Sequence, residues 1–262
     1  MSILDTIISA KRQEVEDRKQ RVSTRDLEGS AFFQRTPLSF KQFILDPERT
    51  GIIAEFKRKS PSKGIINDHS LVEEVTRDYA EGGASALSVL TDQEFFGGST
   101  SDLHKARINN IPILRKDFII DEYQVLEAKA MGADVILLIA ACLSPLEVKN
   151  LAGFAQRAGL EILLELHDDN ELEHMNQYTE IIGINNRNLK TFEVDMEKSI
   201  RMAERIGRER VRVAESGISK PEDIIEFRNY GFDGFLIGER FMKENDPGQA
   251  FRSFVDSLKS LA

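Results

Sequence analysis

Residues 52–64 read Ile52-Ile53-Ala54-Glu55-Phe56-Lys57-Arg58-Lys59-Ser60-Pro61-Ser62-Lys63-Gly64, an apolar run that ends in a carboxylate, three cations, a serine and a turn. Side chains alternate across a β-strand, so Glu55 and Lys57 are expected to point the same way, into one cavity. Such a density of charge at one strand end suggests an anion site. A solvated surface turn would explain this stretch on its own, but similar endings recur further along the chain.

Short runs rich in Val, Ile and Leu alternate with longer amphipathic stretches from residue 51 onward. This alternation is typical of βα units around a parallel sheet. The predicted strands are 52–56, 86–90, 113–116, 135–139, 162–166, 181–185, 212–215 and 234–237. The predicted helices that follow them are 71–81, 101–108, 122–131, 145–157, 169–175, 195–205, 221–230 and 247–261. Eight alternating pairs predict an α/β protein of the (β/α)8 TIM-barrel type.

Glycine signatures close several predicted helices before the next strand. They are Gly82-Gly83-Ala84-Ser85, Gly132-Ala133-Asp134 and Gly231-Phe232-Asp233-Gly234. Glycine supplies the left-handed cap that ends a helix. A doubly wound open sheet could give a similar rhythm, but it usually has fewer strands and one dominant glycine-rich loop after its first strand. No G-x-G-x-x-G follows residues 52–56.

The first 50 residues stand outside this repeat. An apolar stripe of Ile3, Leu4, Ile7 and Ile8 precedes a charged run over 11–21, which predicts an added helix packed against the barrel. We therefore expect a single domain over residues 1–262, with an N-terminal helical extension at 1–50 and the barrel at 51–262.

Composition limits the class of partner. Lysine and arginine number 35 against 44 acidic residues, a formal net charge of -9, which disfavours a general nucleic-acid surface and favours a small anionic partner. The single cysteine, Cys142, cannot form an internal disulfide, and residues 1–10 lack a continuous apolar signal region. No apolar run approaches the roughly 18 residues of a membrane span. We expect a cytoplasmic protein, and a monomer.

Polar residues gather at the predicted strand ends, where barrels place their catalytic groups. They are Glu55 and Lys57, Arg115-Lys116-Asp117, Leu164-Glu165-Leu166, Asn185-Asn186-Arg187 and Glu215-Ser216-Gly217. An ion pair or a solvated rim would explain each alone. Five such endings at one mouth predict an active site.

A phosphate site is predicted after the last two strands. Gly217 permits close backbone approach, and Ser219 and Glu222 have the spacing of a capping box. Gly238-Glu239 precedes Phe241-Met242, which could form the short extra helix that binds phosphate in many barrels. An ordinary helix cap would explain either feature separately, but the pairing favours phosphate.

The residues at these positions resemble the indole-3-glycerol phosphate synthase family over nearly the whole chain. The resemblance rests on 3–11, Glu55-Phe56-Lys57-Arg58-Lys59-Ser60-Pro61-Ser62, Ser88-Val89-Leu90-Thr91-Asp92, Phe95-Phe96-Gly97-Gly98-Ser99, Leu114-Arg115-Lys116-Asp117-Phe118, Leu164-Glu165-Leu166-His167, Gly183-Ile184-Asn185-Asn186-Arg187-Asn188-Leu189 and Ala214-Glu215-Ser216-Gly217-Ile218. It implies ring closure of 1-(2-carboxyphenylamino)-1-deoxyribulose 5-phosphate to indole-3-glycerol phosphate, with release of carbon dioxide and water and without a cofactor.

The resemblance also implies residue roles. Lys116 would be the acid for ring closure, Glu165 the base or proton shuttle, and Lys57 a phosphate and substrate ligand that assists dehydration. Glu55 would orient the lysines, and Asn185 and Arg187 would hold the substrate near its carboxylate.

The remaining roles concern binding. Glu215 and Ser216 would contact sugar hydroxyls or support other carboxylates, and Phe96 and Phe118 would form the wall of the anthranilate pocket. Ser60, Gly217 and Gly238 would line the phosphate site. Glu239 stands where some family members carry serine, so only its backbone N–H could serve an anion and its carboxylate is expected to point away.

Two alternative functions can be compared with the residues of the sequence. Phosphoribosylanthranilate isomerase, another barrel enzyme, needs a cysteine base and an aspartate acid, but Cys142 follows strand four rather than strand one. A catalytically silent phosphate-binding or scaffold barrel would not need Lys57, Lys116 and Glu165 together. No metal site is predicted because the four histidines are scattered, and His167 and His174 are expected at the surface.

Overall fold

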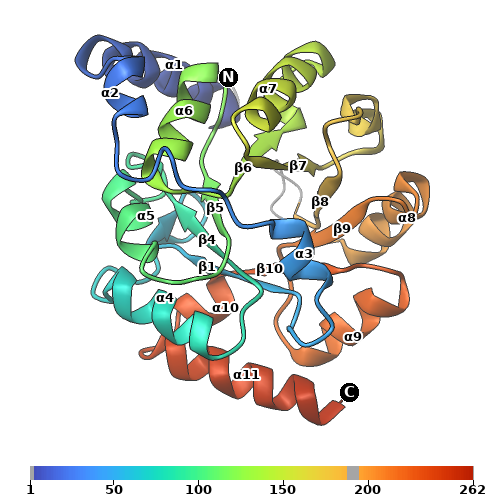
Figure 1. Cartoon of the computed structure of the whole chain (residues 1–262). Helices are drawn as coiled ribbons and strands as arrows, with labels where there is room; N and C mark the ends of the chain where they lie inside the picture. Colours follow the sequence, from blue (N-terminus) through green and yellow to red (C-terminus); the bar gives the residue numbers. More distant parts are fainter. Residues whose placement is uncertain (1–2, 188–194, 262) are drawn as a thin grey trace.

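The computed structural model describes residues 3–187 and 195–261. Eight parallel strands form a closed barrel in the order β1-β10-β9-β8-β7-β6-β5-β4 (Figure 1). Their bounds are β1 Ile52–Phe56, β4 Ala86–Leu90, β5 Ile113–Lys116, β6 Val135–Ile139, β7 Glu161–Leu166, β8 Ile181–Asn185, β9 Val211–Glu215 and β10 Gly234–Ile237. The predicted TIM barrel is confirmed, because each strand matches its predicted bounds to within one residue.

Helices cover the outside of the barrel. They are α4 Val72–Glu81, α5 Thr100–Ala106, α6 Glu122–Met131, α7 Pro145–Arg157, α8 Met196–Ile206, α9 Pro221–Asn229, α10 Glu239–Met242 and α11 Pro247–Leu261. Gly83, Gly132 and Gly231 have φ angles of 97°, 90° and 80°, which confirms the predicted left-handed positions at helix ends. The short helix predicted after Gly238 is α10.

One local prediction needs correction, and the structure adds two short elements. The predicted helix at 169–175 is a 3-10 helix, η2 (Asp169–His174), in which the Met175 N–H donates to the carbonyl of Leu172. The ring of His174 contacts the carbonyl of Glu171 in the same turn, so a side chain takes part in its hydrogen bonding. A two-stranded hairpin, β2 (Lys59–Ser60) and β3 (Gly64–Ile65), also follows β1 and was not predicted, because its strands are too short and polar to show a period. Another short 3-10 helix, η1 (Ala140–Cys142), follows β6.

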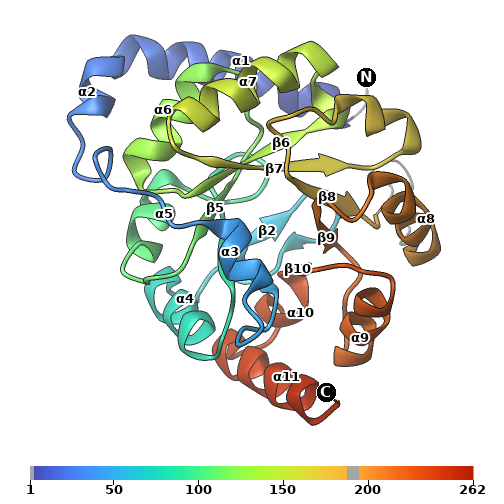
Figure 2. The ribbon, with the colours of Figure 1, turned by 45° about the vertical axis from the view of Figure 1, so that its right-hand side comes forward.

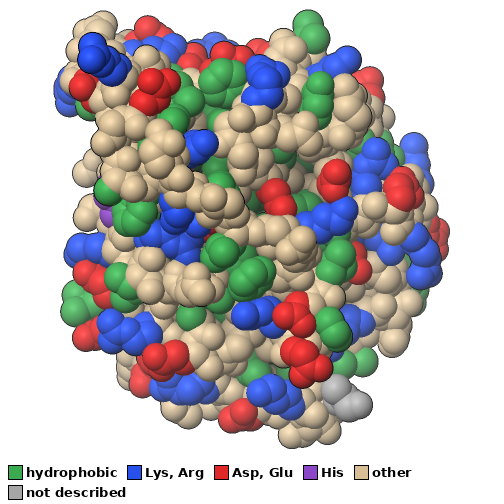
Figure 3. All heavy atoms as spheres, in the orientation of Figure 1, with side chains coloured by type: hydrophobic (Ala, Val, Ile, Leu, Met, Phe, Trp, Pro, Cys, Tyr) green, Lys and Arg blue, Asp and Glu red, His purple; other side chains and the backbone are tan. Residues whose placement is uncertain are grey.

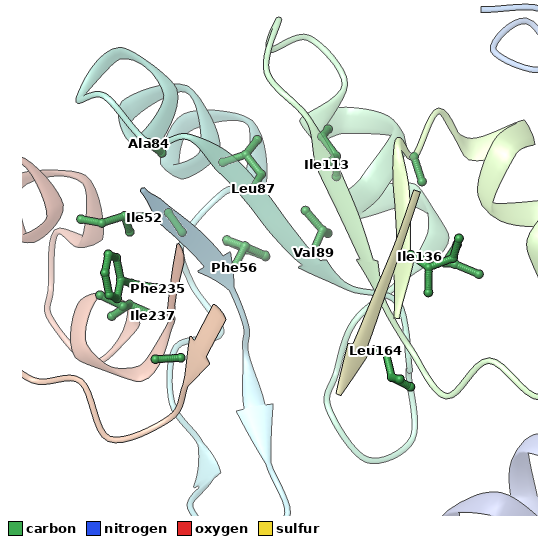
Figure 4. Packing of buried hydrophobic residues seen from close by; sticks show 14 of the residues in the cluster. Ile52, Phe56, Ala84, Leu87, Val89, Ile113, Ile136, Leu164, Phe235 and Ile237 are labelled. Carbon is green, nitrogen blue, oxygen red and sulfur yellow. The ribbon is translucent and has the colours of Figure 1, made fainter. Parts of the chain in front are cut away.

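The larger part of the core lies between the strands and the surrounding helices. Ile52 and Phe56 on β1 belong to one buried cluster with Phe235 and Ile237 on the neighbouring strand β10 (Figure 4). The same cluster reaches Phe251 on α11 and Val125 on α6. Burial of this kind supplies most of the free energy that favours folding.

A second buried cluster fills the barrel interior at the amino ends of the strands. Helix α3 (Phe40–Leu45) contributes Phe40 and Ile44, which pack with Ile53 of β1 and Val213 of β9. Figure 1 shows α3 lying across this end of the barrel. The helix therefore closes one end and leaves the opposite end for the site.

The N-terminal extension packs beside α6. Helices α1 (Ile3–Arg21) and α2 (Thr24–Glu28) lie near α6 and on the side of the barrel opposite α11 in both views (Figures 1 and 2). Ile7, Lys11 and Val15 form the buried side of α1. The predicted added helix is therefore present, and its contact face includes a charged residue.

The surface seen in Figure 3 mixes basic and acidic side chains over the face that carries α3. Within residues 3–187 and 195–261, none of the helices has the length and apolar character needed to span a membrane.

Candidate active site

A cavity of about 620 Å³ is lined by residues at the carboxyl ends of the barrel strands. It lies at the end of the barrel where such folds place their active sites. The structure brings together every site residue that the sequence predicted: Glu55, Lys57, Ser60, Phe96, Lys116, Phe118, Glu165, Asn185, Arg187, Glu215, Ser216, Gly217, Gly238 and Glu239.

The Lys116 ammonium lines the cavity and lies among three carboxylates. Its Nζ is 2.9 Å from Glu215, 3.6 Å from Glu165 and 3.9 Å from Glu55. These four residues come from β5, β9, β7 and β1, which are alternate strands of the barrel. Inward-facing residues of alternate strands share a layer in this fold, so the barrel geometry itself assembles the cluster.

The charges in this cluster shift each other's pKa values. Burial alone would lower the pKa of Lys116, but Glu215, Glu165 and Glu55 outweigh it and raise the pKa well above its usual range. Burial alone would raise the pKa of Glu165, yet Lys116 and His167 hold it well below its usual range. Burial raises the pKa of Glu215 to about 8, because the lowering effect of Lys116 is offset in part by Glu165. The cluster therefore offers a cationic donor next to an ionised acceptor.

Glu55 connects the two lysines of the site. Its Oε1 is 2.8 Å from Lys57 Nζ, and its Oε2 accepts a hydrogen bond of 3.2 Å from the Ser88 hydroxyl. Burial alone would raise the pKa of Glu55, but Lys57 and Lys116 outweigh burial and lower it. Glu55 and Lys57 share one cavity, as strand alternation predicted.

One side of the cavity is aromatic and apolar. Phe96 and Phe118 follow β4 and β5, and their ring centroids are 6.0 Å apart at an interplanar angle of 41°. Leu137 and Ile139 of β6 continue this wall. Such a wall fits a planar aromatic group.

The other side is built from backbone at the ends of β9 and β10. Ser216 and Gly217 have positive φ angles of 68° and 80°, so the chain turns sharply after Glu215. Serine in the left-handed region is strained, and such strain is often kept at functional sites. The capping prediction here was wrong in its residue: Asp223, not Glu222, accepts from the backbone N–H of Ser219 and Lys220, because α9 begins one residue later than that spacing assumed.

The Glu239 carboxylate does not point away from the site, contrary to the prediction. Its Oε2 is 3.5 Å from Arg187 Nη2, and its Oε1 is 3.8 Å from Lys63 Nζ. Two cations from other loops attract it across the cavity mouth. Asn188 and Leu189, which belong to the motif that includes Arg187, lie outside the described residues.

Comparison with known proteins identifies the family to which the chain belongs. A sequence model described as "Indole-3-glycerol phosphate synthase" matches residues 4–254. The chain belongs to the indole-3-glycerol phosphate synthase family. The indole-3-glycerol phosphate synthase of Bacteroides thetaiotaomicron is 48% identical over 258 residues, covering 98% of this chain and 99% of the relative. The enzyme of that name from Polaromonas naphthalenivorans is 44% identical over 253 residues, covering 95% of this chain and 96% of the relative.

Solved structures of tryptophan synthase share the fold. The α subunit from Legionella pneumophila has a TM-score of 0.61 at 15% identity, covering 84% of this chain and 95% of that chain. The A-subunit from Pyrococcus furiosus has a TM-score of 0.60 at 15% identity, covering 81% of this chain and 99% of that chain. At this identity the likeness concerns the fold alone.

Two histidines are buried, so their predicted surface placement is wrong. His167 is 8% exposed and lines the cavity, with Nε2 3.0 Å from Glu165 Oε1. His174 is 7% exposed, and its ring nitrogens contact the carbonyls of Glu171 and Leu143. Burial alone would lower the pKa of His167, but Glu165 and Glu171 raise it. Alternation along β7 carried a signal for His167, since it stands two residues after Glu165.

Gly183 of β8 packs against the site and was not singled out by the sequence prediction. A Cβ at Gly183 would collide with Oε1 of Glu215 on the neighbouring strand. The missing side chain therefore makes room for a buried carboxylate. Its position two residues before Asn185, on the same face of the strand, was the available signal.

The polar side chains of the site are proton donors and acceptors. Among residues 3–187 and 195–261, no group of three or more His, Cys, Asp or Glu side chains is arranged to hold a metal ion.

Proposed function

We propose that this site catalyses the reaction of its family. The carboxyphenylamino-deoxyribulose phosphate closes to indole-3-glycerol phosphate and loses carbon dioxide and water. The observation that carries the proposal is the Lys116 ammonium held by Glu215, Glu165 and Glu55 between an aromatic wall and a turn of backbone amides.

Lys116 is the acid for ring closure. The aryl carbon attacks the C2′ carbonyl, and negative charge develops on that oxygen. A buried ammonium stabilises the charge and donates a proton. Burial alone would lower the pKa of Lys116, but its three carboxylates outweigh burial and raise it. The side chain is therefore a charged ammonium before the reaction.

Glu165 accepts or relays the proton that must leave after decarboxylation. Its carboxylate is ionised because Lys116 and His167 lower its pKa against the effect of burial. Asn185 Nδ2 donates a 3.2 Å hydrogen bond to Glu165 Oε1 and orients the acceptor. Lys57, held by Glu55, binds the substrate and assists departure of the hydroxyl in the dehydration step.

The two sides of the cavity bind the two ends of the substrate. Phe96 and Phe118 pack against the anthranilate ring, and Arg187 with Asn185 holds its carboxylate. Glu215 and Ser216 contact the hydroxyls of the sugar chain. The phosphate binds Lys57, Ser60 and the backbone amides of Gly217, Gly238 and Glu239.

Two alternatives are less well supported. Burying a lysine with three carboxylates costs desolvation free energy. A phosphate-binding barrel without catalytic activity would not require such a cluster. An isomerase with a cysteine base would need a reactive thiolate. Burial raises the pKa of Cys142 to about 12, and Glu165 and Glu171 add to that increase, so its thiol stays protonated.

Indole fluorescence tests the proposal directly. Purified protein is mixed with the substrate, and indole emission is followed over time. The chain contains no tryptophan and only 4 tyrosines, so the background is low. A rise in emission with release of carbon dioxide is expected. Substrate that binds without product formation would support the silent barrel instead.

We further propose that the chain works as a monomer in the cytoplasm, with a small phosphorylated molecule as its partner. Size-exclusion chromatography with light scattering tests the oligomeric state.

A further inference from the structure

Lys11 of helix α1 is a buried cation outside the barrel strands. Only 1% of its surface is exposed, and its Nζ lies 2.9 Å from Asp92 Oδ2, 2.9 Å from Asp117 Oδ1 and 2.7 Å from Glu14 Oε2. Burial alone would lower the pKa of Lys11, but Asp117, Asp92 and Glu14 raise it, so the side chain is an ammonium. Removing one partner of such a buried cluster leaves an uncompensated charge, which is strongly destabilising.

Its two barrel partners hold the loops that carry the aromatic wall. Asp92 Oδ1 accepts hydrogen bonds from the backbone N–H of Phe95 at 2.8 Å and of Phe96 at 3.1 Å. Asp117 Oδ1 accepts from the backbone N–H of Phe118 at 2.8 Å. One ammonium therefore joins the two loops whose rings face each other across 6.0 Å.

The barrel anchors Asp117 from its other side. Asp117 Oδ2 accepts a hydrogen bond of 2.6 Å from Thr91 Oγ1 and one of 3.1 Å from Arg115 Nη2. Arg115 also donates a hydrogen bond to Glu127 of α6. Asp117 therefore has a fixed place directly after β5, next to Lys116. Lys11 links the second loop, through Asp92, to this fixed point.

The same helix reaches the cavity itself. Ile3, Leu4 and Ile7 of α1 line it. Ile7 and Lys11 are separated by one helical turn and share the buried side of α1. The ion cluster and the cavity-lining residue Ile7 therefore lie on the same side of α1.

We propose that Lys11 is a positioning residue for the reaction, which holds Phe96 and Phe118 at the separation that receives the anthranilate ring. The inference rests on the proposed function, since it assigns those two rings to the aromatic end of the substrate. It adds that a residue of the N-terminal extension determines affinity for that end and leaves the phosphate end unaffected.

Lys11→Met tests this inference, because methionine keeps most of the volume and removes the charge. We expect KM to rise about tenfold, the factor that corresponds to roughly 1.4 kcal/mol of binding free energy. The inhibition constant of inorganic phosphate should stay within about twofold of the parent value, a difference of only about 0.4 kcal/mol. A general loss of structure would change both KM and the phosphate inhibition constant. A rise in KM alone therefore distinguishes a positioning effect from a folding defect.

Lys19→Met is the matched control. Lys19 lies on the same helix and joins it to the barrel through Asp121 of the α6 N-terminus at 2.7 Å, but its partners do not bind the amides of the aromatic wall. Its KM should equal that of the parent. If Lys11→Met does not fold, the double variant K11M/D92N is used instead, because it also removes the buried Asp92 charge that would be left without its cation. Its KM and its phosphate inhibition constant are compared with those of the parent in the same way.

Anthranilate binding, followed by its own fluorescence, keeps this test separate from the test of function. A parent that binds anthranilate but forms no indole overturns the proposed function. Equal anthranilate affinity and equal KM in the parent and the folded Lys11 variant overturn the inference. Weaker phosphate binding in proportion to the rise in KM would also overturn it.

Discussion

The Lys116 ammonium lies 2.9 Å from Glu215 Oε2, in an ion pair that joins β5 to β9 across the barrel interior. Glu165 and Glu55, at 3.6 Å and 3.9 Å, are beyond the range of short charge-assisted hydrogen bonds. They stabilise the charge of the ammonium without fixing its direction. A substrate oxygen can therefore approach the donor while Glu215 keeps it in place.

Replacing Lys116 with methionine should remove the proton donor. We expect kcat to fall by about 100-fold or more, the usual scale of general acid catalysis, while KM changes much less. Steady-state kinetics by indole fluorescence measure both. Lys41→Met is the control, because Lys41 pairs with Glu180 at the exposed opposite end of the barrel. A folded Lys116 variant with kcat within about threefold of the parent would place the acid elsewhere.

Glu165→Gln nearly preserves shape and removes the proton acceptor. We expect kcat to fall by about 100-fold or more. In the parent, the rate should decline as pH falls through the lowered pKa of Glu165, since the acceptor must be ionised; the variant should lack this acidic limb. A pH–rate profile measures the difference, with the exposed Glu173→Gln in the same βα unit as control. An unchanged acidic limb in Glu165→Gln would mean that the limb reflects the ionisation of another group.

Much of the fold could be predicted because each barrel strand is a buried apolar run bounded by turn residues. β4 and β6 are buried at every position, so their runs of Leu, Val and Ile carry a clear signal. The hairpin after β1 carries none, since Gly64 and Ile65 are exposed. In η2 the His174 ring contacts the carbonyl of Leu143 in another loop, a contact that spacing does not reveal.

The site could be predicted where strand alternation aligns residues, and was missed where it depends on contacts between distant segments. Glu55, Lys116 and Glu165 follow from their places at strand ends. The burial of Lys11 depends on Asp92 and Asp117, which are far away in the sequence. The direction of Glu239 likewise depends on Lys63 and Arg187 from two other loops.

His167→Gln should shift the pH dependence of both activity and stability. The variant removes a cation that lowers the pKa of Glu165, so the acidic limb of the rate should move to higher pH. The folded-state pKa of His167 is raised, so its stabilising effect is fully present below the unfolded value of about 6.5 and is lost as pH rises through the folded value. The variant should therefore lower Tm at about pH 5.5 and leave Tm nearly unchanged at about pH 9.

The control for this histidine variant is the same pair of measurements on His69→Gln, since His69 is exposed. An equal loss of Tm at both pH values would mean that His167 acts by packing alone.

Gly238→Ala should disturb the catalytic cluster although it replaces no charged residue. An added Cβ at Gly238 would lie 2.7 Å from Glu55 Oε1 and 2.9 Å from Glu55 Cβ, closer than packing allows. Glu55 must then move, and with it the Lys57 ammonium that it holds at 2.8 Å. Displacements near 1 Å at a catalytic site can cost on the order of 100-fold in rate, so we expect kcat to fall by at least about tenfold. Gly29→Ala is the control, because a Cβ there would meet only ordinary contacts at 3.5 Å on α2. Full activity in a folded Gly238→Ala enzyme would show that the position of Glu55 does not limit the reaction.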